Sequence, residues 1–121
     1  MSPTPERPDL QALLAKWQKI LRLQDWQIKI EFRRKFDMPE YKQGTVGFNA
    51  GKKMAAIGII DPIDYSPKSD WPQDVEGTIV HELLHLHFGL TDTSKSGSLE
   101  EDLWEQAINS LETALVGLDR K

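Results

Sequence analysis

The 121-residue sequence predicts a single α+β domain in which a small three-stranded, mostly antiparallel sheet packs against three helices. Two kinds of hydrophobic periodicity lead to this prediction. Apolar residues recur every three or four positions near the start of the chain and in its second half, as they do in amphipathic helices. Between these stretches apolar and polar residues alternate, as they do in half-buried strands. The sequence shows no internal repeat and no linker, so we expect one domain over residues 9–121.

The composition limits the class of protein. Fifteen basic and nineteen acidic residues give a formal net charge of −4, which argues against a surface for nucleic acid or for an anionic membrane. The sequence has no cysteine, so a zinc site would have to use histidine and carboxylate ligands. Residues 1–8 are polar and rich in proline, and we expect a disordered leader there rather than a signal peptide. A cytoplasmic protein is the default expectation.

The first predicted helix runs from Leu10 to about Leu23, with Asp9 as its N-cap. A half-buried strand is predicted at residues 26–33, because apolar and polar side chains alternate along it. Its apolar face carries Trp26, Ile28, Ile30 and Phe32.

Two further strands are predicted at residues 41–48 and 54–60. The turn-forming residues 49–52 between them indicate a hairpin. The strand at 54–60 is apolar or small on both faces, which favours a central place in the sheet. Asp61 and Asp64 follow this strand, and we expect them to form turns rather than to bind a metal.

The second helix is predicted to begin near Trp71 and Pro72 and to run to Phe88. Gly89 can then supply a left-handed C-terminal cap. A polar loop leads to the last helix, for which Ser98 is the expected N-cap. The buried stripe expected on that helix consists of Leu103, Trp104, Ala107, Ile108, Leu111, Ala114, Leu115 and Leu118.

The second helix contains the motif His81-Glu82-Leu83-Leu84-His85. Residues four apart lie one turn apart on the same face of a helix, so the two imidazoles can bind one small cation. Glu82 lies about 100° around the helix, where its carboxylate can flank a water held by the metal. Since the rest of the helix is apolar, these polar groups need a partner, and a zinc ion supplies one. The alternative is a buried His–Glu hydrogen-bond network without metal.

A catalytic zinc site takes three protein ligands and keeps one position open. His87 faces another side of the helix, so the third ligand should be a carboxylate of the last helix. Glu105 is preferred, because Glu101 has a role in the capping box with Ser98; Glu101 is the alternative ligand. Asn109, one turn after Glu105, is the candidate to hydrogen-bond a ligand histidine. The other carboxylates considered are Glu100, Asp102 and Glu112.

The His81–His85 motif, followed by Glu105 and Asn109, resembles the gluzincin branch of the zincin metallopeptidases. In that branch two histidines of one helix are joined by a glutamate from the next. The spacing of Glu105 and Asn109, and the strand and hairpin before the motif, resemble the short bacterial and phage-associated zincin-like proteins, including the ImmA/IrrE group. The resemblance covers residues 26–118. It implies a zincin-like fold, a Zn²⁺ cofactor and a peptide or protein substrate.

Two functions from different classes are compatible with these residues. One is a zinc-dependent metallopeptidase in which Glu82 is the general base of peptide hydrolysis. The alternative is a zincin-like binding or regulatory protein, phage-derived, with weak or no catalysis. No tyrosine or histidine follows the motif helix to stabilise a transition state, which favours the alternative. We expect no nucleic-acid or membrane partner, and the sequence does not predict an oligomeric state.

Overall fold

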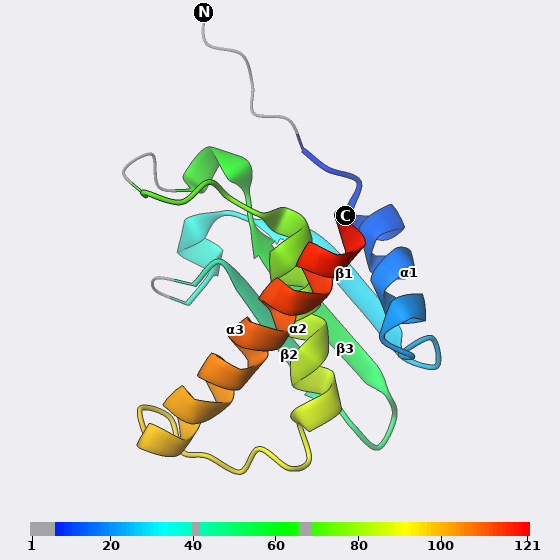
Figure 1. Cartoon of the computed structure of the whole chain (residues 1–121), viewed down its shortest axis with the longest axis vertical. Coiled ribbons are helices and arrows are strands. Elements are labelled where there is room, and N and C mark those ends of the chain that lie inside the picture. Colours follow the sequence, from blue (N-terminus) through cyan, green and yellow to red (C-terminus); the bar gives the residue numbers. More distant parts are fainter. Residues whose placement is uncertain (1–6, 40–41, 66–68) are drawn as a thin grey trace, which may run out of the picture.

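The computed structural model of the chain describes residues 7–39, 42–65 and 69–121 (Figure 1). Most of the expected leader and Tyr41 lie outside these residues. The main elements are α1 (Leu10–Ile20), β1 (Gln27–Arg33), β2 (Gly44–Asn49), β3 (Met54–Ile60), α2 (Val75–Phe88) and α3 (Leu99–Asp119). Two short 3-10 helices lie at Lys35–Asp37 and Pro62–Asp64. The predicted α+β class with three helices and a three-stranded sheet is confirmed.

The sheet is mixed and has the strand order β1-β3-β2. The predicted hairpin is confirmed, because β2 and β3 pair antiparallel, with Asn49 opposite Met54. β1 pairs with the other side of β3 in parallel, with Gln27 opposite Met54. β3 is therefore the central strand, as its two apolar faces predict, and it is mostly buried. The hydrophobic pattern shows which side chains are buried but not the direction of a neighbouring strand, so the parallel pair could not be derived from it.

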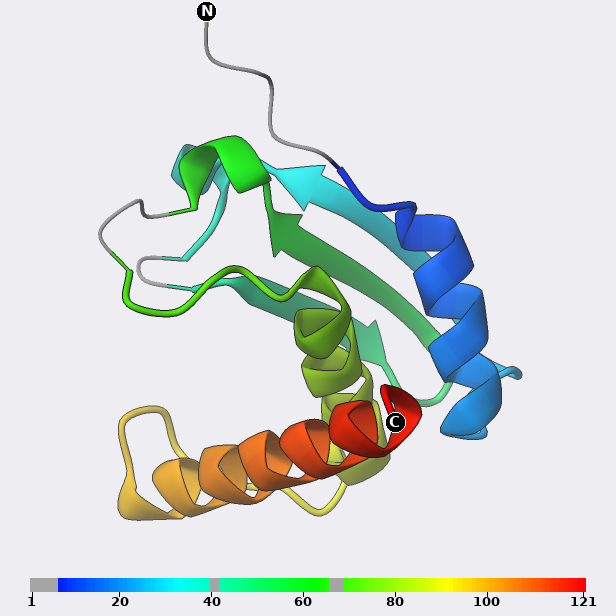
Figure 2. The same ribbon diagram turned by 45° about the horizontal axis from the view of Figure 1, so that its top comes forward.

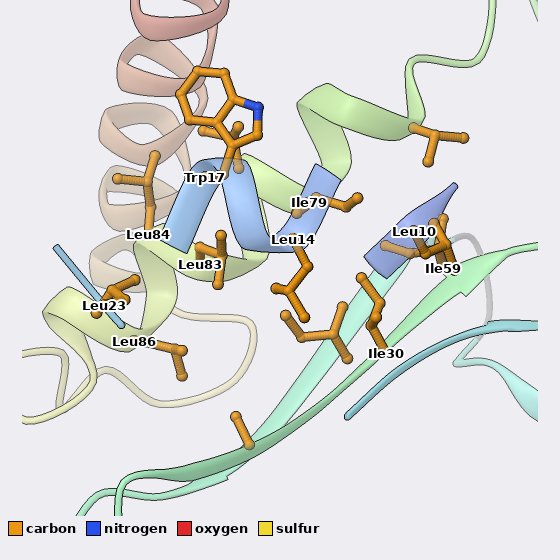
Figure 3. Packing of buried hydrophobic residues seen from close by; sticks show 14 of the residues in the cluster. Leu10, Leu14, Trp17, Leu23, Ile30, Ile59, Ile79, Leu83, Leu84 and Leu86 are labelled. Atoms are coloured by element: carbon orange, nitrogen blue, oxygen red, sulfur yellow. The ribbon is translucent and has the colours of Figure 1, made fainter. Parts of the chain in front are cut away.

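The core lies between the sheet and the helices α1 and α2 (Figures 2 and 3). Leu14 and Trp17 of α1 and Ile79 and Leu83 of α2 are buried within it, and Ile57 of β3 is fully enclosed. α3 contributes fewer buried side chains to this core, because it packs mainly on α2. Among the residues that the structure describes, no helix has both the length and the hydrophobicity needed to cross a membrane.

The ends of two helices differ from the prediction. α1 stops at Ile20, and Arg22 adopts a left-handed conformation with φ of 61°. α2 begins at Val75 instead of near Trp71 and Pro72, because Asp74 is its N-cap and accepts a hydrogen bond from the Gly77 N–H at 2.9 Å.

Gly89 also differs from the prediction. It has a right-handed conformation with φ of −60°, so it is not a left-handed cap. A Cβ atom at this position would lie 2.4 Å from Cζ of Phe48. The glycine therefore makes room for an aromatic ring of β2.

The expected buried stripe of α3 is only partly buried. Ile108 is enclosed, and Trp104 and Leu115 are half-buried; Val116, which the predicted stripe does not include, is enclosed as well. Because α2 covers only one side of α3, the remaining apolar residues face outward. These are Leu103, Ala107, Leu111, Ala114 and Leu118.

Candidate metal centre

His81 and His85 lie one turn apart on α2, on the side that faces α3. The opposite side of α2 is held in the core by Ile79, Val80 and Leu83, none of which is exposed. This burial fixes the rotation of α2 about its axis. Both imidazoles are only partly exposed, at 16% and 22% of their side-chain area. Their ring centroids are 5.0 Å apart.

Glu105 of α3 lies between the two imidazoles. Its Oε2 is 3.1 Å from Nε2 of His81, and its Oε1 is 3.0 Å from Nε2 of His85. One ligand atom from each of these three residues lies within 4.8 Å of the others. The structure thus brings together the three residues that the sequence predicts as ligands.

These residues fit a zinc ion. Zinc–ligand bonds of 2.0–2.2 Å in a tetrahedron place neighbouring ligand atoms about 3.3 Å apart. The distances from the Glu105 oxygens to Nε2 of His81 and Nε2 of His85, 3.1 and 3.0 Å, are only slightly shorter. A small movement of the carboxylate would therefore admit the ion. Two imidazoles and one carboxylate are also a common donor set of catalytic zinc sites.

Glu82 is a buried carboxylate next to this cluster. The residue is only 5% exposed, and its Oε2 atom is buried and has no hydrogen-bond partner in the part of the chain that the structure describes. Burial raises the pKa of Glu82 to about 7; the negative charge of Glu105 adds to this effect, while His81 and Lys42 oppose it. A buried oxygen without a partner costs free energy, so this atom points to a ligand that belongs in the site.

Glu112 contacts the other nitrogen of the His81 ring. Its Oε1 lies 3.1 Å from His81 Nδ1. This contact selects the tautomer in which Nδ1 carries the proton, so Nε2 is free to bind a cation. Glu112 lies two turns after Glu105 on the same side of α3, and this spacing is the signal that could have assigned it this role.

Asn109 was the residue predicted to make such a contact. It lies on the wall of the cleft and is exposed, and it makes no hydrogen bond to His81 or His85. The longer reach of the Glu112 side chain and its position on the helix place it nearer His81.

The two histidines respond differently to their surroundings. Burial lowers the pKa of His81, but the hydrogen bond to Glu112 and the charges of Glu82 and Glu105 outweigh it, so the pKa is raised. Burial also lowers the pKa of His85, and there Glu105 compensates only in part, so the pKa stays below its ordinary value. A neutral imidazole binds a metal, so the environment of His85 favours binding.

The remaining predicted residues take structural roles. Ser98 caps α3 by accepting the Glu101 N–H, and the Glu101 carboxylate accepts the N–H of Gly97 at 3.1 Å. Glu101 is therefore used at the helix end and lies outside the cluster. His87 is exposed, and its Nε2 donates to the Leu21 carbonyl at 2.7 Å, as expected for a packing histidine.

Asp61 forms a turn, as predicted, whereas the side chain of Asp64 makes long-range contacts instead. Asp61 accepts the N–H of Ile63, and its carboxylate also pairs with Arg7. Asp64 accepts the N–H of Lys35 and pairs with Arg34. Neither aspartate lies in the metal cluster.

The cluster lies in a cleft of about 990 Å³ between β2, α2 and α3. Gly44, Thr45 and Val46 of β2 form one wall. Among the described residues β2 pairs with no strand but β3, so its other edge runs along this wall without a strand partner. Phe48 and Trp71 add exposed aromatic surface at the rim.

No protein-family model matches the chain, and no curated protein is significantly similar to it. The candidate site therefore rests on the geometry of these residues.

Proposed function

We propose that the protein is a zinc-dependent peptidase. The observation that supports this proposal is the convergence of His81, His85 and Glu105 beside Glu82, whose buried Oε2 has no hydrogen-bond partner among the described residues. An ion-pair cluster that served only stability would not need a buried oxygen without a partner. A bound zinc ion supplies Lewis-acid chemistry: it polarises a carbonyl group and acidifies a water molecule.

Glu82 is the general base in this proposal. Its carboxylate takes a proton from the attacking water and passes it to the amine that leaves. Glu112 keeps the His81 ring in one tautomer and orientation.

The free edge of β2 is the proposed place of an extended substrate. A peptide can add to such an edge through backbone hydrogen bonds, which select no particular side chain. Gly44 and Thr45 would align it beside Glu82, since all three residues line the same cleft.

The test separates metal binding from catalysis. We expect stoichiometric zinc in the purified wild type and in Glu82→Gln, and loss of zinc in His81→Ala. Glu82→Gln should lower the hydrolysis of a peptide library at least about 100-fold, because it removes the general base. Glu31→Gln, at an exposed carboxylate of β1, is the control and should retain full activity. Equal turnover by Glu82→Gln and wild type would remove Glu82 as the base.

A binding or regulatory protein with the same metal centre is the second candidate. Tyr65 favours it, because this tyrosine lines the cleft but its hydroxyl donates to the Trp71 carbonyl at 2.6 Å. It is therefore not a free donor for a transition state. Stoichiometric zinc without cleavage of any peptide, together with one stable partner in a pulldown, would favour this candidate over the peptidase.

A further inference from the structure

α3 carries an exposed apolar face. Leu103, Leu111 and Leu118 are 56%, 40% and 63% exposed, and Ala107 and Ala114 between them are also exposed. Their spacing of three or four residues places them on one side of the helix, in a band that we call the α3 stripe. The stripe extends over about 22 Å, or roughly four turns.

No charged side chain interrupts the α3 stripe. Between residues 103 and 118 the only charged residues are Glu105 and Glu112, and both face α2 and the metal centre. Charged residues make up 28% of the whole chain, so an uncharged exposed face of this length is unusual for its surface. Exposed apolar faces of this kind mark sites of association.

We propose that the α3 stripe binds the α3 stripe of a second copy of this chain, with the two helices antiparallel about a two-fold axis near Ser110 and Leu111. In this arrangement Leu103 faces Leu118 of the second copy. Ala107 faces Ala114, and these small residues let the two backbones approach closely. The same patch serves both copies, so the contact closes as a dimer.

The charges at the two ends of α3 determine the direction. Glu100, Glu101 and Asp102 lie in the first turn, and Lys121 lies just beyond the last one. Antiparallel helices bring Glu100 of one copy near Lys121 of the other, whereas parallel helices would bring like charges together. Opposed helix dipoles also favour the antiparallel arrangement. Asp119 and Arg120 are not available for this contact, because Asp119 already pairs with Lys16 and Arg120 with Asp74.

The dimer leaves the metal centre accessible. Glu105 and Glu112 lie about 100–200° around α3 from the residues of the stripe. The cleft of each copy therefore stays open, and the dimer does not depend on the proposed peptidase activity.

The first experiment measures the mass of the full chain in solution by sedimentation at several concentrations. We expect the wild type to approach twice its chain mass of 13.8 kDa, and Ala107→Glu/Ala114→Glu to remain monomeric. Both alanines are exposed, so the variant should keep the helical circular dichroism and the zinc content of wild type. The matched control is Ala12→Glu/Ala15→Glu, which adds the same charge to exposed alanines of α1 and should remain dimeric. A monomeric wild type, or a dimeric Ala107→Glu/Ala114→Glu, overturns the proposal.

The second experiment tests the direction of the helices. Glu100→Lys should weaken the dimer about three- to tenfold, because each of the two symmetric contacts then joins two lysines. Adding Lys121→Glu to the same chain restores opposite charges and should restore the affinity. If the double variant dissociates as readily as Glu100→Lys, the antiparallel arrangement is wrong.

Discussion

His81 joins the two carboxylates of α3 to the metal centre. Its Nε2 faces Glu105, and its Nδ1 faces Glu112. The Glu112 carboxylate accepts from Nδ1–H and fixes the plane of the ring, so Nε2 is the nitrogen that faces the space where a cation would bind. At the scale of single residues, Glu112 thus positions the candidate ligand His81 without itself belonging to the cluster.

Glu112→Gln should weaken zinc binding about 10- to 100-fold, as is usual when the partner of a ligand histidine is lost. The expected cause is that the amide is a weaker acceptor for Nδ1–H and can present its NH₂ group instead. Competition with a coloured chelator measures this affinity directly. Asn109→Ala is the matched control on the same face of α3, and it should bind zinc like wild type. Equal affinities for all three proteins would contradict the positioning role.

The residues of the centre were predictable to different degrees. His81 and His85 follow from a local rule, because four residues make one turn. Glu105 needed a second argument, the assignment of Glu101 to the helix cap. Glu112 was considered only as another possible ligand, since its role depends on how α2 and α3 are rotated about their axes. That rotation is set by packing in the core and not by the spacing of residues in either helix.

The contact between β2 and α2 depends on a glycine. A Cβ atom at Gly44 would lie 2.5 Å from Cγ2 of Thr78 and 3.4 Å from Cγ of Glu82. The missing side chain therefore allows the edge strand to approach the helix that carries the motif. At the scale of elements, Gly44 sets the width of the cleft at Glu82.

Gly44→Ala should destabilise the protein by about 1–3 kcal/mol, because the added methyl group overpacks this contact. Urea unfolding followed by tryptophan fluorescence measures the difference. Gly47→Ala in the same strand is the control, since no atom lies within 4 Å of its added Cβ. The prediction fails if the two variants lose the same stability.

The structure confirms the predicted elements but moves several of their ends. α2 begins after Asp74 and not at Pro72, because a helix begins where a side chain can cap it. The outward face of α3 could not be foreseen either. An amphipathic pattern shows that a helix has an apolar side, but it does not show whether one neighbour is wide enough to cover it.

Ion pairs connect the three helices to one another. Lys16 of α1 binds Glu76 of α2 and Asp119 of α3, and Arg120 binds Asp74 at the start of α2. The buried indole of Trp17 also donates to Glu76, at 2.6 Å. The hydrogen bonds from Arg120 hold the pKa of Asp74 below its ordinary value. Burial raises the pKa of Glu76, but the bonds from Lys16 and Trp17 outweigh it, so this pKa is also lowered.

Stability should therefore fall on acidification. A carboxylate with a lowered native pKa stabilises the fold fully above its unfolded pKa of about 4, and the contribution is lost as the pH falls through the native value. We expect the melting temperature to decline below about pH 4. Arg120→Gln should melt lower at neutral pH and show a shallower decline, because the pKa of Asp74 then rises. Lys29→Gln, at an exposed position of β1, should follow the wild-type curve.

The parallel pairing of β1 with β3 has a consequence for how the chain folds. The paired residues Asn49 and Met54 of the hairpin are five residues apart in the sequence, whereas the paired residues Gln27 and Met54 are 27 residues apart. Pairing β1 with β3 therefore costs more conformational entropy of loop closure than forming the hairpin. The hairpin should thus form in the folding transition state and β1 should dock later. Stopped-flow kinetics can test this order. Asn49→Ala, which removes the acceptor of the Lys52 N–H, should slow folding, and Ile30→Val in β1 should mainly speed unfolding. The opposite pattern would mean that the long-range pair forms first.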